Sequence, residues 1–149
     1  MINSEKIKDL RDKTGVSMMI CKKALEETGG DEAKAMEWLS KNGMQFAEKK
    51  SERQTKAGLV EAYVHSNGRV GVLVELKTES DFVAKNSEFK EIAHNIAMHV
   101  AASGVSEMEA LLEEPYIKNP SIKVSDYLNE AIQKFGENME ISRFSRFEV

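Results

Sequence analysis

Residues 59–76 read LVEAYVHSNGRVGVLVEL and place two runs of β-branched and aromatic residues on either side of Asn67-Gly68. Runs of this composition favour strands. An Asn-Gly pair between them is the strongest short-range signal for a β-hairpin, because a type I′ turn needs positive φ at both central positions. The sequence therefore predicts strands near residues 59–65 and 69–77, joined by a type I′ turn.

The residues after the hairpin predict the rest of a small α+β domain. Apolar side chains recur at i, i+3 and i+4 spacing from Phe89 to Ala101, which indicates an amphipathic helix. The last segment is expected to pair with the hairpin and complete a three-stranded antiparallel sheet, with two helices on one face. The unbroken run at Val72-Leu73-Val74 predicts that the second strand is covered on both faces for part of its length.

After the hairpin, the predicted elements are, in chain order, a helix over 88–103, a brief acidic helix over 106–114, a loop over 115–123, a helix capped by Ser125 that stops at Gly136, and a strand over 137–149.

Upstream of the hairpin, the sequence predicts a three-helix module. Three segments with apolar residues at helical spacing are stopped in turn by Gly15, by Gly29-Gly30 and by Gly43. In size and in the layout of its glycine turns this module is similar to ubiquitin-associated (UBA) modules. The predicted organisation is a UBA-like module over 1–44, a charged connector over 45–57 and a single core domain over 58–149.

The connector has a local positive bias from Lys49, Lys50, Arg53 and Lys56. One interpretation is a contact with an acidic or phosphate group. The other is a solvated helical linker, and this second interpretation is favoured because charge runs usually keep a surface hydrated.

Composition excludes several classes of protein. The chain has 149 residues, of which 41% are hydrophobic and 31% charged, with a formal net charge of −4. That balance argues against a general nucleic-acid binder, which would show a basic excess. A single cysteine, Cys21, forms no internal disulfide and suggests a reducing compartment. The charged N-terminal stretch and the lack of a long apolar run predict a cytoplasmic protein with no secretory signal and no membrane span.

Residues for catalysis or metal binding are sparse. His65, His94 and His99 are spread over a predicted strand and helix, and the last two are five residues apart, which does not stack them on one helical face. No CxxC, HExxH, GxSxG or phosphate-binding glycine loop is present. Cys21 is interpreted as an inert thiol rather than a nucleophile. The sequence therefore predicts neither an enzyme nor a resident metal or cofactor.

The segment Ser80-Asp81-Phe82-Val83 lies in a polar loop between a predicted strand and a predicted helix. In one interpretation Ser80 or Asp81 caps a turn and Phe82 covers the edge of the core. In the other, Phe82 is an exposed apolar wedge with a charge beside it, held by a rigid scaffold as a binding loop must be. Spacing alone favours the first.

Met18-Met19-Ile20 offers a similar choice. Neighbouring helical residues point about 100° apart, so the three side chains do not share one buried face. At least one methionine is expected to be exposed, where it suits adaptable protein contacts. The alternative, in which both methionines fill gaps in the core, is about equally supported.

Three blocks of sequence, in this order, resemble the translation elongation factor Ts family. They are LRDKTGVSMMICKKALEETGGDEAKAMEWL at 10–39, ESDFVAKNSEFKEIAHNIAMHVAA at 79–102 and GENMEISRF at 136–144. Together they cover most of the chain. One departure is Ser80, where the family has threonine. Another is length, because typical members are nearly twice as long and have two related core subdomains, so the chain resembles a short form.

This resemblance implies a guanine-nucleotide exchange factor for elongation factor Tu, bound in its GDP and nucleotide-free states. Ser80, Asp81, Phe82 and Val83 would act at the magnesium site of the GTPase, with Phe82 as the wedge. Because a second core half is missing, either one sheet does the work of two or two chains pair to rebuild the missing half. The open edges of the small sheet favour the second alternative, a homodimer.

The same resemblance places docking on the N-terminal module. Arg11, Met18, Met19 and Ile20 match the docking segment of the family, whereas Leu10 is expected in the module's core. The alternative function is a UBA-like adaptor that binds a protein partner without exchange activity. That alternative gives no role to the Asp-Phe-Val loop or to the Gly-Glu-Asn block.

Overall fold

The computed structural model describes the backbone of residues 2–50 and 53–149, and their side chains except those of 43–50. The chain divides into two compact units. The first, here called the helical unit, comprises Met1–Glu52 and Asn129–Glu137; the second, the sheet unit, comprises Arg53–Leu128 and Asn138–Val149. The predicted boundaries at residues 44 and 57 stay predictions.

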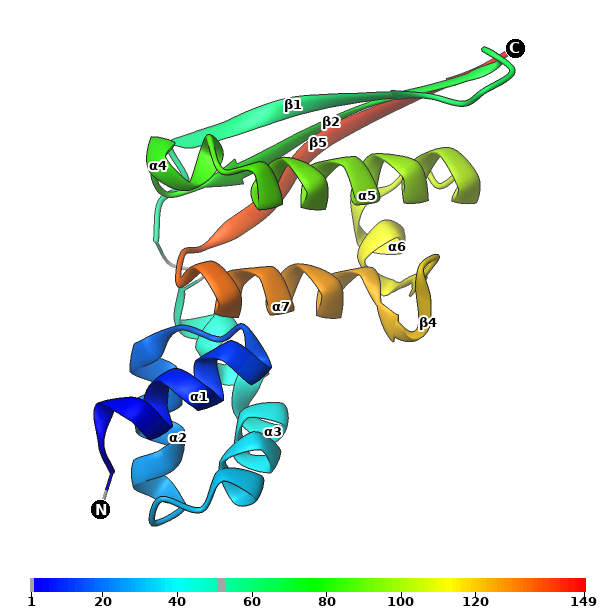
Figure 1. The fold of residues 1–149 in the computed structure, drawn as a ribbon. Coiled ribbons are helices and arrows are strands. Elements are labelled where there is room, and N and C mark those ends of the chain that lie inside the picture. The colour runs from blue at the N-terminus through cyan, green and yellow to red at the C-terminus, as the bar shows by residue number, and fades with distance from the viewer. Residues whose placement is uncertain (1, 51–52) are drawn as a thin grey trace. The chain divides into compact units, whose positions relative to one another are not determined.

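The helical unit contains three helices at its N-terminal end: α1 (Ser4–Thr14), α2 (Met18–Glu27) and α3 (Glu32–Lys50) (Figure 1). Asn3 begins α1, where its Oδ1 accepts a hydrogen bond from the Lys6 amide at 2.9 Å. Asp31 begins α3, where its Oδ1 accepts from the Lys34 amide at 3.1 Å. The buried residues that pack together between these helices are Leu10, Val16, Ile20, Cys21, Ala24, Leu25, Ala35 and Leu39.

The third helix does not stop at Gly43 as predicted. It continues to Lys50, so the first residues of the predicted connector are helical. A glycine inside a helix costs only about 1 kcal/mol relative to alanine, and the Gln, Ala, Glu and Lys residues that follow are good helix formers. The side chains of Lys49 and Lys50 lie outside the described residues.

The predicted three-stranded antiparallel sheet is confirmed. It consists of β1 (Ala57–Val64), β2 (Val70–Thr78) and β5 (Met139–Glu148), in the order β1-β2-β5 (Figure 1). The register between β2 and β5 shifts after Glu75, next to Ser142, whose hydroxyl donates to Glu75 Oε1 at 2.6 Å.

The turn between β1 and β2 is not of type I′. Of its central residues only Gly68 has positive φ, at 72°, and Asn67 does not. The strands pair as far as Val64 and Gly71, and the His65 amide donates to the Val70 carbonyl at 2.9 Å, so the connection is longer than two residues. Asn67 instead uses its side chain, whose Oδ1 accepts from the Arg69 amide at 3.0 Å.

One face of the sheet is covered and the other is open. Helix α5 (Ser87–Ser103) and the short helix α4 (Asp81–Ala84) lie against β1 and β2 (Figure 1). The buried side chains of this core include Val72, Val74 and Leu76 from β2 and Phe89, Ile92, Ile96 and Val100 from α5.

On the opposite face Leu73 is 50% exposed, so the predicted cover on both faces of β2 is wrong. The residues here called the open face are Val60, Ala62 and Val64 from β1, Leu73 from β2 and Phe147 from β5, all exposed and all on one side by register.

The predicted loop between the two prolines contains a small second sheet. After α6 (Met108–Glu113), strand β3 (Pro115–Tyr116) pairs with β4 (Asn119–Lys123). Buried His99 on α5 holds this segment, because its Nδ1 accepts from the Ile117 amide at 3.1 Å and its Nε2 lies 3.2 Å from Glu114 Oε2. Helix α7 (Val124–Phe135) follows, and its residues divide between the two units.

Gly58 allows β1 to approach β2 closely. A Cβ at this position would overlap the carbonyl oxygen of Leu76 and lie 2.9 Å from Lys77 Cα. Gly58→Ala should therefore destabilise the chain by at least about 2 kcal/mol in urea unfolding followed by circular dichroism. Gly71→Ala is the matched control, because its Cβ would meet only Val64 Cγ2, at 4.0 Å. Equal stability of the two variants would contradict the assigned role of Gly58.

Candidate protein-binding site

A single helical turn follows the end of β2 and carries the segment singled out in the sequence. Ser80 begins α4, where its Oγ accepts from the Val83 amide at 3.3 Å. The Ala84 and Lys85 amides donate to the Ser80 and Asp81 carbonyls, both at 3.1 Å. We call residues 80–85 the Phe82 turn.

Phe82 projects from this turn into solvent. Its side chain is 86% exposed, whereas the next residue, Val83, is buried. The interpretation in which Phe82 covers the edge of the core is therefore wrong, although the predicted cap by Ser80 is present. Burying a phenylalanine ring is worth roughly 1.5–3 kcal/mol, so a ring held in water is available to bind an apolar surface of a partner. Asp81 is exposed beside it.

The Phe82 turn rests on a hydrogen-bonded base. The Asn138 amide donates to Glu79 Oε2 at 2.7 Å, and Asn138 Nδ2 donates to the Arg53 carbonyl at 2.8 Å. Arg53 Nη1 lies 3.7 Å from the same Glu79 oxygen. Neither Glu79 nor Asn138 was among the predicted site residues. The Gly-Glu-Asn block, which resembles the family, drew attention to the segment that contains Asn138. Its contacts with Glu79 and Arg53 could not be predicted from local pattern, because these residues are far apart in the chain.

In the helical unit, the predicted docking residues separate into two groups. Arg11 on α1 and Met18 and Met19 on α2 are exposed, and Met19 is 83% exposed. Ile20 is buried in the core of this unit, and its predicted contact with a partner stays a prediction. Val83 is buried as well, and its predicted role at the partner's magnesium site likewise stays a prediction. Both side chains support the exposed residues next to them.

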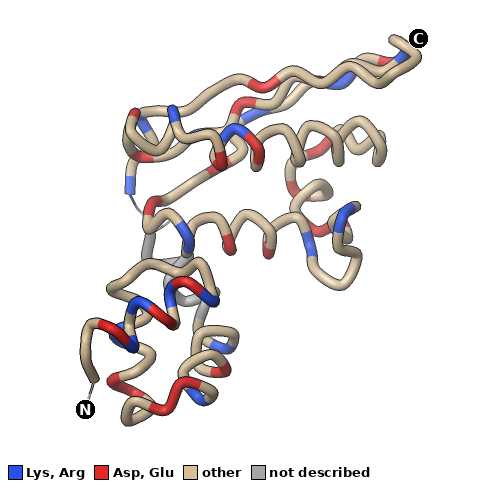
Figure 2. Tube along the Cα trace, viewed as in Figure 1, with Lys and Arg blue, Asp and Glu red and all other residues tan. Residues whose placement is uncertain are grey.

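Outside this turn, titratable side chains of β1 and α5 lie together around Tyr63, whose ring contacts those of His65 and His94. His94 Nδ1 lies 3.9 Å from Glu61 Oε1, and Tyr63 Oη lies 3.1 Å from His65 Nδ1. Over the described residues, no group of three or more His, Cys, Asp or Glu side chains is placed to hold a metal ion. None of the described helices has the length and apolar character needed to cross a bilayer. Basic and acidic residues are both spread along the described trace (Figure 2).

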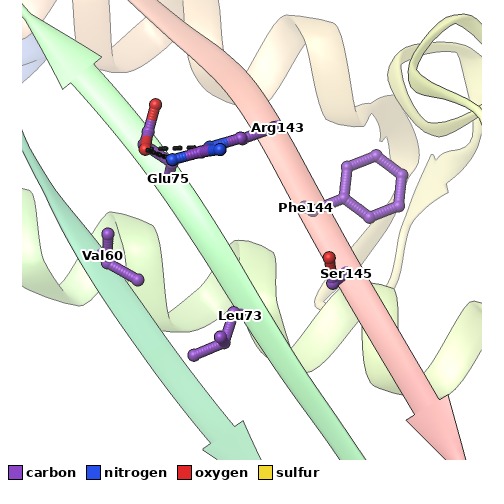
Figure 3. Close-up of a pocket in the computed structure, with 6 residues that line it drawn as sticks. All are labelled: Val60, Leu73, Glu75, Arg143, Phe144 and Ser145. Atoms are coloured by element: carbon purple, nitrogen blue, oxygen red, sulfur yellow. Dashed lines mark hydrogen bonds and ion pairs between the residues drawn. The ribbon is translucent and has the colours of Figure 1, made fainter.

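A shallow hollow of about 220 Å³ lies over the open face (Figure 3). Its apolar lining residues are Val60, Leu73 and Phe144. The Glu75–Arg143 ion pair also lines it, with Glu75 Oε2 3.1 Å from both Nε and Nη2 of Arg143. The pKa of Glu75 lies below its usual range, first because Ser142 donates a hydrogen bond to it and then because of Arg143.

Comparison with known proteins gives one consistent family. A family model described as Elongation factor TS matches residues 79–149. An elongation factor Ts of Carboxydothermus hydrogenoformans is 42% identical over 194 positions, which take in 100% of this chain and 89% of that protein. An elongation factor Ts of Thermotoga petrophila is 41% identical over 191 positions, covering 99% of this chain and 96% of that protein.

The relatives are longer within the aligned region itself. An elongation factor Ts of Oleidesulfovibrio alaskensis is 37% identical over 193 positions, covering 99% of this chain and 98% of that protein. Because this chain has 149 residues, each of these proteins contains internal residues that have no counterpart here. Even so, the identity extends over essentially the whole chain. The resemblance in the sequence is thereby confirmed, and the chain belongs to the elongation factor Ts family of translation elongation factors.

Proposed function

We propose that this protein is a guanine-nucleotide exchange factor that promotes release of GDP from elongation factor Tu. The observation that carries the proposal is Phe82, an aromatic ring 86% exposed on a capped turn whose neighbour Val83 is buried in the core. A rigidly held apolar side chain can enter a partner's surface without first being ordered, which lowers the entropic cost of binding.

The proposed mechanism acts on the magnesium ion of the GTPase. Phe82 inserts between helices of elongation factor Tu and shifts the segment that supports Mg²⁺. The ion bridges protein and diphosphate oxygens, so its loss weakens GDP binding. Asp81, exposed beside Phe82, adds negative potential near the diphosphate or competes for the donors that hold the ion and its waters.

Thermodynamic linkage gives the direction of the cycle. A partner that weakens GDP binding is itself weakened by GDP by the same factor. The protein therefore binds the nucleotide-free GTPase best and leaves when nucleotide returns. No covalent bond changes, so the protein is an exchange factor and not an enzyme. We place this activity in the cytoplasm, with no nucleic-acid or membrane partner.

Docking is proposed to use Arg11, Met18 and Met19. All three are exposed on α1 and α2, and Ile20 lies in the core behind them. Methionine is unbranched and polarizable, so an exposed pair adapts to an irregular apolar surface. The helical module thus supplies affinity, and the Phe82 turn of the single core subdomain supplies the effect on nucleotide.

The proposal is tested by release of a fluorescent GDP analogue from purified elongation factor Tu. Catalytic amounts of this chain should accelerate release strongly. No acceleration by a folded sample would refute the exchange function. A UBA-like adaptor, the alternative, would capture a mixed set of proteins from a bacterial lysate, whereas an exchange factor should capture one dominant GTPase.

We further propose that the protein forms a homodimer through its open face. Exposed apolar side chains on one side of the sheet, with the Glu75–Arg143 pair beside them, suit a two-fold contact in which each patch meets its own copy. Contiguous apolar surface of this kind on a small domain marks an interaction site.

Leu73→Asp should convert a dimer into a monomer in sedimentation at tens of micromolar protein, because it places a charge in an apolar contact. Ile117→Asp is the control, since Ile117 is 48% exposed in the turn between β3 and β4, close to the 50% of Leu73. A monomeric wild-type protein at high concentration would remove the dimer proposal.

A further inference from the structure

We propose that Glu79 and Asn138 are positioning residues that fix the Phe82 turn in its active orientation. This inference rests on the proposed exchange function, because it assigns a purpose to the exposed Phe82 ring. Neither side chain is placed to meet the partner itself. Asn138 is buried, and the Glu79 side chain is only 22% exposed.

The two residues meet where the backbone leaves the sheet. Thr78 pairs with Met139 in the last register position of β2 and β5. Glu79 follows the last residue of β2, and Asn138 precedes the first residue of β5. Here the Asn138 amide donates to Glu79 Oε2 at 2.7 Å. A carboxylate therefore takes the place of the next backbone acceptor, in a charge-assisted hydrogen bond that is stronger than a neutral one.

The same base joins a third segment of the chain. Asn138 Nδ2 donates to the Arg53 carbonyl at 2.8 Å, and Arg53 Nη1 lies 3.7 Å from Glu79 Oε2. The approach to β1, the end of β2 and the start of β5 are thus connected at Glu79, the residue that precedes Ser80 in the chain. Because the cap residue of α4 follows Glu79 without a spacer, movement of Glu79 moves the first turn of α4.

The Phe82 turn needs such support because it has little of its own. Helix α4 is a single turn, and one helical turn is unstable in isolation. The ring of Phe82 packs against little of its own chain, so its orientation depends on buried Val83 on one side and on Glu79 on the other. Losing the base would leave the ring exposed but no longer fixed. The wedge would then have to be ordered after docking, when it enters the GTPase, so the step that releases GDP would slow while docking is retained.

Glu79→Ala should lower the maximal rate of GDP release by roughly tenfold and leave the half-saturating concentration of this protein within about twofold. The docking residues Arg11, Met18 and Met19 are unchanged in the variant, so affinity is retained. Glu79→Gln keeps an acceptor oxygen and should recover most of the rate. Glu114→Ala is the matched control, because Glu114 also bonds a buried group, His99, at a site away from the turn.

Two measurements separate positioning from a general loss of structure. In a Phe82→Ala background, Glu79→Ala should cause no further loss, because its effect passes through the ring. In the free protein, Glu79→Ala and Asn138→Ala should accelerate hydrogen exchange of the amides of residues 83–86 and leave those of residues 92–100 unchanged. Asn138→Ala retains the backbone donor, so it provides a milder variant if Glu79→Ala fails to fold.

Three results would overturn the inference. The first is unchanged hydrogen-exchange protection of the amides of residues 83–86 in both Glu79→Ala and Asn138→Ala. The others are a further loss of GDP-release rate when Glu79→Ala is added to Phe82→Ala, and an effect of Glu79→Ala on the half-saturating concentration alone. Failure of the proposed function gives a different pattern. If the wild-type protein does not accelerate the release of GDP from elongation factor Tu, the exchange function is refuted. Hydrogen exchange of the free chain still decides whether Glu79 and Asn138 hold the turn.

Discussion

Replacement of Phe82 by alanine should lower the acceleration of GDP release from elongation factor Tu by at least about 30-fold. The variant loses an aromatic side chain that becomes desolvated in the complex, and such a side chain contributes on the order of 2 kcal/mol. Because the wild-type ring is 86% exposed, its removal leaves no cavity and should not change the stability of the free chain. The measurement is stopped-flow release of a fluorescent GDP analogue over a range of exchange-factor concentrations.

The control for Phe82→Ala is Ile117→Ala, which also removes a partly exposed apolar side chain from the sheet unit. Ile117→Ala should accelerate the release of GDP from elongation factor Tu as strongly as the wild-type protein does. Asp81→Asn tests the charge separately from the ring. If Phe82→Ala retains full activity, exchange remains the function but the wedge mechanism is wrong, and another surface must act on the nucleotide.

A negative charge introduced at Met19, in the first turn of α2, should strongly weaken binding to elongation factor Tu. Met19→Asp is expected to weaken the complex with nucleotide-free elongation factor Tu by roughly 100-fold, because an unpaired carboxylate would be buried in an apolar contact. Met19 is 83% exposed, so the substitution should leave the fold of the helical unit unchanged. Isothermal titration calorimetry measures the change directly.

Met36 provides the comparison for Met19. It is an exposed methionine of the same helical unit, on α3 rather than α2. Met36→Asp should leave the affinity unchanged within about twofold. Equal weakening by both substitutions would indicate a general effect of charge, and no weakening by either would reject docking through this end of α2.

Local signals in the sequence predicted most of the elements. The hairpin followed from strand-forming runs around Asn67-Gly68, and the long helix from apolar spacing. The turn type was wrong because the register of β1 and β2 sets the length of the connection, and that register depends on the whole sheet. The end of α3 was wrong because a single glycine is a weak stop in a run of good helix formers.

Non-local contacts account for what was missed. Strands β3 and β4 are held by His99, which lies on α5 many residues away. Non-local packing also decides which of the predicted site residues are exposed and which are buried. Spacing showed that Met18, Met19 and Ile20 face different directions, but only packing decides that Ile20 is buried. Likewise, nothing local to Phe82 and Val83 indicates which of the two apolar side chains points outward.

The single thiol of the chain has a practical consequence for all of these experiments. Cys21 is fully buried, its Sγ donates to the Val16 carbonyl at 3.5 Å, and burial raises the pKa of the thiol. At neutral pH it is almost entirely protonated and shielded, so maleimides and other thiol reagents should react with it very slowly. A cysteine introduced at an exposed position such as Ile117 would then accept one fluorophore at one place. The native sequence thus serves directly as the background for single-site labelling, without removal of its own cysteine.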